Sequence, residues 1–490
     1  MPRLLKLAGL AGPVLLGLLL GGCNRRPDQG PVVVSAIGGA PELIDPARRP
    51  LDTPSRLLRD ATAQGLVRFD AQGRVAPGLA ERWTVLDDGA SYVFRLREAE
   101  WPDGKRVTAG DVVAALDRQR AEGSRNPLAP YLTAIDEIVE MTPQVIEVRL
   151  KRPRPDLLNL FAQPELGIAR QRPPGGSGPY RAKPALGGFV LLKPVPDPVR
   201  VAEGDVPSPE ENVLLTGERA ARALARFRAG RSDLVAGGSF LDLPIARVAG
   251  IAPANFRLDL PAGLFGLAIV SREGFLSEAA NRAALAEAID RAALTAAFAD
   301  DWAPAEQILP DRLDSANPPA IPSWAVTDAT ARRAEARARV ATWRKAHGGA
   351  APVLRVALPQ GPGANLLFGF VGASLRAIGV DLVRVPADAE AELRLIDAVA
   401  PYDSARWYLT TACPVTSDAA AAKLIDARDA NDMSTRGVML AEADGLIAAD
   451  QCYIPIARPL RWAAVSLRLA RWQGNARGWH PLNELRRDTR

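Results

Sequence analysis

The chain has 490 residues, of which 48% are hydrophobic, and its 61 lysine and arginine residues against 56 acidic residues give a formal net charge of +5. Seven of the basic residues are lysine, and acidic residues are interspersed with arginine along the chain. A nucleic-acid-binding surface needs clustered positive charge, so we expect no nucleic-acid partner. The length exceeds what a single hydrophobic core supports and predicts two or three domains.

The first residues have the pattern of an export signal. Two basic residues precede an uncharged apolar run at 7–20, and Gly21 and Gly22 lead to Cys23. This run is shorter than the roughly 20 residues that a bilayer-spanning helix needs. The ending Leu-Gly-Gly-Cys resembles a bacterial lipobox, in which the cysteine is acylated and becomes the new first residue. The alternatives are an ordinary secretory signal with a chance cysteine, or an uncleaved anchor.

We therefore expect a signal peptide at 1–22, lipidation at Cys23 and a flexible tether at 23–30. No later segment contains 18 uncharged apolar residues in succession, so the remaining body is expected to be soluble. In an exported protein, Cys413 and Cys452 form a disulfide candidate that would close a loop of about 40 residues. Two buried thiols are the alternative interpretation, and the sequence does not decide between them.

Strand and helix signals follow in chain order. The β-branched run at 32–37 predicts a buried strand, and 92–96 and 145–150 predict two more. Thr108 is a candidate N-cap for a helix that continues to residue 120. Two strand–helix–strand units are then expected, at 212–216, 218–229 and 233–236, and at 353–358, 366–378 and 380–385. Asp328 is the expected N-cap of a surface helix at 329–346.

Enzyme signatures are missing from the sequence. It contains no G-x-S-x-G elbow, no G-x-x-x-x-G-K-[ST] phosphate loop and no H-E-x-x-H metal helix, and it has two histidines. We therefore expect no catalytic residues, no metal site and no cofactor. Ligand binding is the favoured class of function.

An ordered series of motifs carries a family resemblance. The motifs are Ile44-Asp45-Pro46, Gly65 to Asp70, Pro77 to Trp83, Asp87-Asp88-Gly89, Tyr92 to Arg97, Trp101 to Lys105, Thr108 to Val112, Gly176 to Tyr180, Asn281 to Arg291, Leu375 to Val380 and Tyr453 to Ile456. In this order, over nearly the whole mature chain, they resemble the family 5 extracellular solute-binding proteins, the peptide, dipeptide and nickel receptors of ABC importers. The best-matched segments also suit tight turns and a helix cap, so they bear on the fold more than on the ligand.

The resemblance implies an α/β, two-lobed periplasmic-binding-protein fold, hinged in the Venus-flytrap manner, with an additional domain inserted in lobe I. Lobe I would comprise 31–52, 170–258 and 455–490. Domain II would be 53–169, and lobe III would be 259–454. Ligand would favour the closed state of the hinge, which the transporter recognises.

In peptide-binding relatives a lobe III aspartate pairs with the peptide amino terminus. The candidate segment here is 401–408, where Asp403 would bind the ammonium group and Tyr402 and Trp407 would form pocket walls. The alternative is that these aromatic residues belong to the core and that Asp403 is a turn residue. The segment departs from the family pattern Asp-Tyr-x-Asp-Pro at Ala405 and Arg406, and Arg406 could favour a carboxylate ligand.

On the opposite side of the cleft we expect ligand contacts from glycine-rich loops and turns of lobe I. These residues are Gly38, Gly39, Ala40, Ser177, Gly178, Gly238, Ser239 and Phe240. The expected protein is thus a monomeric lipoprotein, extracytoplasmic and anchored to a membrane by lipid, which delivers a peptide or similar small solute to an ABC permease with its ATPase. There are two alternatives. One is a receptor-like lipoprotein that acts as a sensor or envelope interaction protein without transport, and the other is a hydrolase on the same scaffold.

Overall fold

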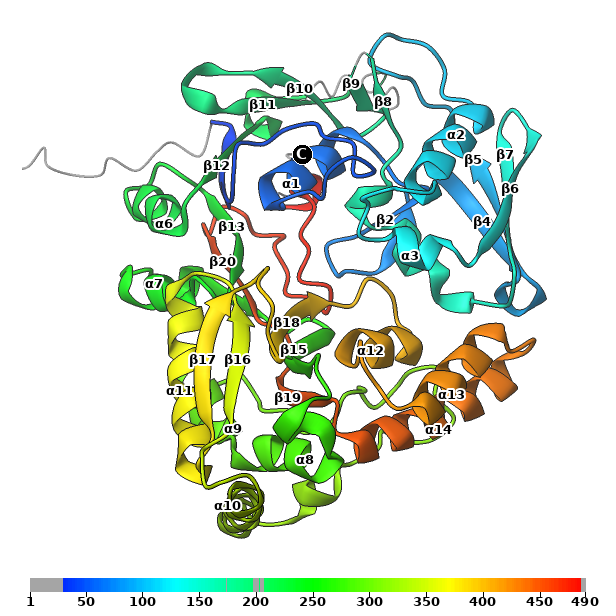
Figure 1. Cartoon of the computed structure of the whole chain (residues 1–490). Helices are drawn as coiled ribbons and strands as arrows, with labels where there is room; N and C mark the ends of the chain where they lie inside the picture. The colour runs from blue at the N-terminus through cyan, green and yellow to red at the C-terminus, as the bar shows by residue number, and fades with distance from the viewer. Residues whose placement is uncertain (1–29, 173, 197–201, 203–206, 486–490) are drawn as a thin grey trace, which may run out of the picture.

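The computed structural model describes residues 30–172, 174–196, 202 and 207–485. In this part the chain forms two lobes, each built on a large sheet, and a smaller domain beside the first lobe (Figure 1). The expected signal segment, Cys23 and nearly all of the tether lie outside the described residues. Of the helices described, none has the length and apolar composition to cross a membrane.

Lobe I is built on a seven-stranded sheet with β1 (Val32–Ile37) near its centre. β1 pairs in parallel with β12 (Val213–Glu218) on one side and with β13 (Leu234–Ser239) on the other. The remaining strands are β10 (Tyr180–Pro184), β11 (Val190–Pro194), β14 (Phe256–Asp259) and β20 (Arg461–Val465). The first five residues of β1 are buried, as a central strand with both faces covered requires.

Helices α1 (Thr53–Thr62) and α6 (Ala220–Arg228) pack on this sheet, and α7 (Leu243–Val248) packs on α6. α6 begins two residues later than the predicted 218. Glu218 remains in β12 because its buried carboxylate accepts hydrogen bonds from Ser35 Oγ at 2.8 Å and from Arg226 Nε at 2.7 Å. These bonds tie the end of β12 to the neighbouring strand and helix.

Domain II contains an antiparallel sheet in the order β4-β5-β7-β6. Its strands are β4 (Ala80–Leu86), β5 (Ser91–Leu96), β6 (Ile135–Thr142) and β7 (Val145–Leu150). The expected turn at 87–89 joins β4 to β5, and α2 (Ala109–Arg120) follows the predicted cap Thr108. The Thr108 hydroxyl accepts from the amide of Asp111, whose carboxylate accepts in return from the amide of Thr108. The short elements are β2 (Val67–Phe69), β3 (Val75–Pro77), β8 (Ala169–Gln171), β9 (Pro174–Gly176), α3 (Ala129–Leu132) and α4 (Leu158–Phe161).

Lobe III is built on a five-stranded sheet in the order β17-β16-β18-β15-β19. Its strands are β15 (Gly263–Ile269), β16 (Val353–Leu358), β17 (Asp381–Pro386), β18 (Leu393–Val399) and β19 (Tyr453–Ala457). Its helices are α8 (Ala279–Ala288), α9 (Arg291–Phe298), α10 (Ala329–Ala346), α11 (Pro362–Ile378), α12 (Ala405–Ala412), α13 (Asp418–Asp429) and α14 (Met433–Asp450). The predicted parallel unit is present as β16, α11 and β17.

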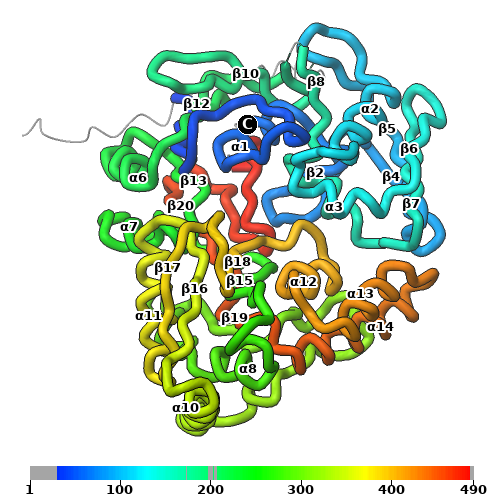
Figure 2. The backbone as a smooth tube through the Cα atoms, in the orientation of Figure 1, coloured from blue at the N-terminus to red at the C-terminus, as the bar shows by residue number. Residues whose placement is uncertain are grey.

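The chain passes between the two large sheets at 260–262 and again at 458–460 (Figure 2). The rings of Phe240 in lobe I and Phe265 in lobe III pack edge to face, with their centroids 4.9 Å apart. The expected boundary at 454 falls inside β19, and the expected boundary at 52 separates α1 from the lobe I sheet. α1 packs on the lobe I sheet, and β19 pairs with β15 of lobe III. We therefore propose boundaries near 62 and 457 in place of those at 52 and 454.

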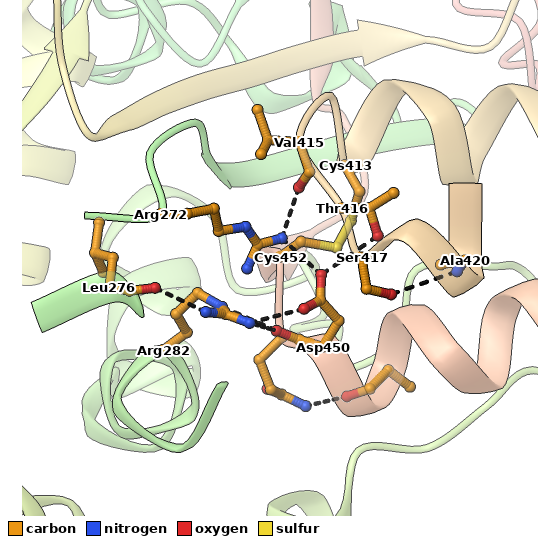
Figure 3. A network of polar contacts seen from close by, with 12 residues as sticks. Arg272, Leu276, Arg282, Cys413, Val415, Thr416, Ser417, Ala420, Asp450 and Cys452 are labelled. Carbon is orange, nitrogen blue, oxygen red and sulfur yellow. Dashed lines mark hydrogen bonds and ion pairs between the residues drawn. A yellow bond between two sulfur atoms is a disulfide. The ribbon is translucent and has the colours of Figure 1, made fainter. Parts of the chain in front are cut away.

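Cys413 and Cys452 form a disulfide between the end of α12 and the start of β19. Figure 3 shows a polar network beside it, centred on Asp450 at the end of α14. The carboxylate of Asp450 accepts from Arg272 at 2.6 Å and from Arg282 at 2.7 Å. The bridge is formed by the candidate pair, and the two arginines fasten the same corner of lobe III.

Candidate functional site

A cavity of about 350 Å³, here called the interlobe cavity, lies where the three parts of the molecule meet. Lobe I contributes Arg56 of α1 and residues of the C-terminal segment, defined as 461–485, domain II contributes the α3 region, and lobe III contributes the end of β18 and α12. The main lining residues are Arg56, Leu128, Tyr131, Gln163, Glu165, Ala400, Pro401, Trp407, Thr411, Arg461, Arg477 and Trp479. The cavity thus combines apolar walls with charged groups, which is typical of small-molecule sites.

Three arginines of the lining each pair with a carboxylate, of which Glu165 also lines the cavity while Asp397 and Asp403 lie beside it. The pairs are Arg56 with Glu165 at 2.6 Å, Arg461 with Asp397 at 2.8 Å, and Arg477 with Asp403 at 2.6 Å. The last two join the C-terminal segment of lobe I to lobe III. Groups of both signs therefore face the space between the lobes, where a ligand with two charged ends could exchange partners with them.

Trp479 positions the lobe I wall. Its indole Nε1 donates to Asp60 of α1 at 3.2 Å, and the guanidinium of Arg56 lies 4.5 Å from its ring centroid. Burial raises the pKa of Asp60 to about 6, against the opposing influence of the hydrogen bond from Trp479. The C-terminal segment is thereby held against α1.

The predicted lobe III segment is at this cavity, but its members have different surroundings. Trp407 is buried and lines the interlobe cavity. Asp403 accepts two hydrogen bonds from Arg477 and one from Asn159 Nδ2 of domain II at 3.1 Å. The Tyr402 ring meets the Tyr131 ring of domain II edge to face at 5.5 Å, and Arg406 faces a second cavity.

The predicted lobe I contacts are dispersed. Gly238 lines a small adjoining cavity of about 100 Å³ that shares Arg56, Arg461 and Trp479 with the interlobe cavity. Ser239 accepts from Trp462 Nε1 through its carbonyl oxygen. The other predicted residues are held by neighbouring segments. In the loop after β1, the amide of Gly39 donates to Asp52, Gly38 packs on Pro54, and Ala40 lies close to Gly217. In the turn before β10, the carbonyl oxygen of Ser177 accepts from Gln64 and the amide of Gly178 donates to the carbonyl oxygen of Thr62. Phe240 is fully buried.

Sequence reasoning missed the charged lining, namely Arg56, Glu165, Arg461 and Arg477, and it missed Asp397, the partner of Arg461. The C-terminal stretch 471–480 carried a usable signal, since it combines two arginines and two tryptophans at the end of a chain with few aromatic residues. Gln163 had no such signal. Its side chain donates to the carbonyl oxygen of Pro401 at 2.8 Å, a contact between residues 238 positions apart.

The fold defines a class of protein, the two-lobed periplasmic binding proteins with an additional domain. The crystal structure of Haemophilus influenzae OppA in complex with the peptide RPPGFSPFR superposes with a TM-score of 0.76 and 16% identity, covering 94% of this chain and 99% of that one. The Escherichia coli murein tripeptide binding protein MppA gives a TM-score of 0.75 with 18% identity, covering 93% and 98% of the two chains. These likenesses confirm the predicted fold class.

Residues 74–412 match the family described as bacterial extracellular solute-binding proteins, family 5, and the chain belongs to this family. The match confirms the resemblance found in the sequence and the expectation of a binding protein rather than an enzyme. A probable deoxycholate-binding periplasmic protein of Escherichia coli, YgiS, is 38% identical over 93 residues. That match covers 19% of this chain and 17% of the relative.

Proposed function

We propose that the protein is the solute-binding component of an ABC importer, held outside the cytoplasm by lipid on Cys23, and that it captures a peptide or a similar small solute. The observation that carries this proposal is the interlobe cavity, whose lining residue Arg477 pairs with Asp403 of the opposite lobe. Solute between the lobes favours the closed arrangement, and an importer distinguishes closed from open receptors.

The charge pairs suggest how a zwitterionic solute is held. Asp403 has 40% of its side-chain surface exposed, whereas Arg477 has 12%. An ammonium group of the solute would displace the guanidinium of Arg477 from Asp403. The released guanidinium, or that of Arg461, would then pair with a carboxylate of the solute. Trp407 would form a wall around the backbone of the solute, whereas Tyr402, predicted as a second wall, lines the other cavity between domain II and lobe III.

Likeness to binding proteins whose solved structures name a peptide and a murein tripeptide supports peptides as the first class to test. Native mass spectrometry of protein purified from its own host tests the proposal, because a closed receptor retains its solute. The expected result is a bound peptide or similar small molecule that denaturation releases. Protein without a retained solute, and without calorimetric binding of di- to pentapeptides, would contradict it.

A further inference from the structure

A second cavity, of about 490 Å³, lies between domain II and the helices α12, α13 and α14 of lobe III. Figure 1 shows these helices below domain II. Six cationic side chains line this arginine cavity: Lys151, Arg152 and Arg154 of domain II, and Arg406, Arg428 and Arg436 of lobe III. Among the described residues that line it, Asp429 alone carries a carboxylate.

Four of these guanidinium groups contact the C-terminal part of α13. Arg406 donates to the carbonyl oxygen of Leu424 at 3.2 Å, Arg436 to that of Ala427 at 2.8 Å, Arg154 to that of Arg428 at 2.6 Å, and Arg152 to that of Asp429 at 3.0 Å. Cations at a helix C-terminus are favourable because the helix dipole places about half a negative charge there. Half a charge is far less than four guanidinium groups supply.

Carboxylates neutralise two of the six cations. Arg428 pairs with Asp429 at 2.8 Å, and the buried Arg436 pairs with Asp314 at 3.0 Å. For Lys151, Arg152, Arg154 and Arg406, the described part of the chain offers no carboxylate within ion-pair distance. Burial, together with the neighbouring Arg436 and Arg406, lowers the pKa of Arg154 to about 10. The cavity therefore holds an uncompensated positive charge.

Helix capping does not account for this arrangement. A guanidinium group has five N–H donors. Arg406 uses its Nε atom on α13, and no hydrogen bond of its two terminal nitrogens is found among the described residues. Arg152 likewise uses Nε and Nη1 on carbonyl oxygens. Donors suited to bidentate pairing thus remain at the cavity.

We propose that the arginine cavity is an oxyanion-binding site that accepts a carboxylate or phosphate group between domain II and lobe III. Because its cations come from both domain II and lobe III, a bound anion would draw these two parts of the molecule together and favour the closed arrangement. Tyr131 lines both this cavity and the interlobe cavity. The anion can therefore be either the acidic end of a solute that extends past Tyr131 or a free anion beside it.

The first test measures binding of inorganic phosphate by isothermal titration calorimetry in a buffer of low ionic strength. Arg154→Gln combined with Arg406→Gln should weaken phosphate binding about tenfold or more, because two charge-assisted contacts are lost. Lys151→Glu is a second variant that leaves the α13 contacts intact and should also weaken binding. The matched controls are Arg376→Gln and Lys105→Glu, whose side chains are 79% and 76% exposed elsewhere on the surface.

Equal phosphate affinity in the wild type and the cavity variants would overturn the proposal. A loss of affinity in Lys105→Glu as large as that in Lys151→Glu would also overturn it, because it would indicate non-specific attraction. Native mass spectrometry then distinguishes the two sources of the anion. If the double variant loses its co-purifying solute and phosphate displaces that solute from the wild type, the anion is the acidic end of the solute. If the solute is retained while phosphate binding is lost, the site binds a free anion. The phosphate titration itself is independent of the proposed function, because it is measured without a peptide.

Discussion

The carboxylate of Asp403 accepts hydrogen bonds from both terminal nitrogens of Arg477, at 2.9 and 2.6 Å. The two residues are 74 positions apart in the chain and belong to opposite lobes, so their ion pair joins the lobes beside the interlobe cavity, which Arg477 lines. Opening of the lobes must break this pair unless the C-terminal segment moves with lobe III. A solute with an ammonium and a carboxylate group can satisfy both partners at once.

Asp403→Asn tests the role of this acid with little change of shape. If Asp403 binds the ammonium group of the solute, calorimetric affinity for the solute that native mass spectrometry identifies should fall roughly tenfold or more. Asp388→Asn, at an exposed acid elsewhere in lobe III, is the control and should bind like the wild type. Unchanged affinity in Asp403→Asn would remove this residue from the ligand site.

Asp314→Ala should destabilise the protein severely. The Asp314 and Arg436 side chains are 6% and 3% exposed, and Asp314 also accepts from the amide of Ala405 at 2.6 Å. Removing one partner leaves a buried, uncompensated guanidinium, which costs about 3–5 kcal/mol. Urea unfolding measures the effect. Glu442→Ala breaks the exposed pair with Lys423 and should cost less than about 1 kcal/mol. Similar losses in the two variants would contradict this distinction.

Replacing both Cys413 and Cys452 by serine should lower the free energy of unfolding by about 4 kcal/mol, since the bridge closes a loop with a sequence separation of 39. Guanidinium unfolding of the wild type and the double variant, each with and without reductant, measures the difference. Reductant should affect the wild type alone. A wild type that is insensitive to complete reduction would show that the bridge adds no stability.

Asp444 should make stability depend on pH. Burial raises the pKa of its carboxyl to about 6, from an ordinary 3.8. The folded state therefore holds this proton more tightly than the unfolded state, and the contribution of Asp444 to stability decreases as pH rises from about 4 to about 6. The Asp444→Asn variant lacks this decrease. The difference in free energy of unfolding, variant minus wild type, should therefore be more positive at about pH 7 than at about pH 4. Urea unfolding at both pH values measures this difference, with Asp388→Asn as the exposed control. The same difference at both values would contradict the assignment.

Cys23→Ser tests the anchor. If Cys23 carries the acyl chains, this variant should move from the membrane fraction to the soluble extracytoplasmic fraction, because two or more chains provide stable anchoring. Fractionation followed by immunoblotting distinguishes the two locations. A variant that remains in the membrane fraction would favour an uncleaved anchor helix instead.

Local structure was predictable where short-range chemistry decides it. The N-cap Asp328 accepts from the amides of Thr330 and Ala331, and α10 has the predicted bounds. The β-branched run at 32–37 is the strand β1 as expected. At Glu218 the predicted helix began too early because residue 218 pairs with Ile37 of β1 in the sheet and accepts from Ser35, tertiary contacts that outweigh helix propensity.

The candidate site was less predictable, because distant segments build it. Trp407 was identified through its neighbours in sequence, whereas Gln163 and Arg477 reach the same cavity from domain II and from the C-terminal segment. Nothing in the local sequence of Asp403 indicates that an arginine and an asparagine meet its carboxylate. Such contacts depend on the relative placement of whole domains.

The position of β20 has a consequence for the order of folding. This strand, made from residues 461–465, lies between β13 and β14 in the lobe I sheet. The strand β1 at the other end of the chain lies two places away. The sheet thus cannot be completed until residue 465 has been synthesised, more than 420 residues after β1, and pairings of such long range form slowly. A chain that must cross a membrane before folding would gain from this delay, since lobe I stays incomplete until β20 has been made.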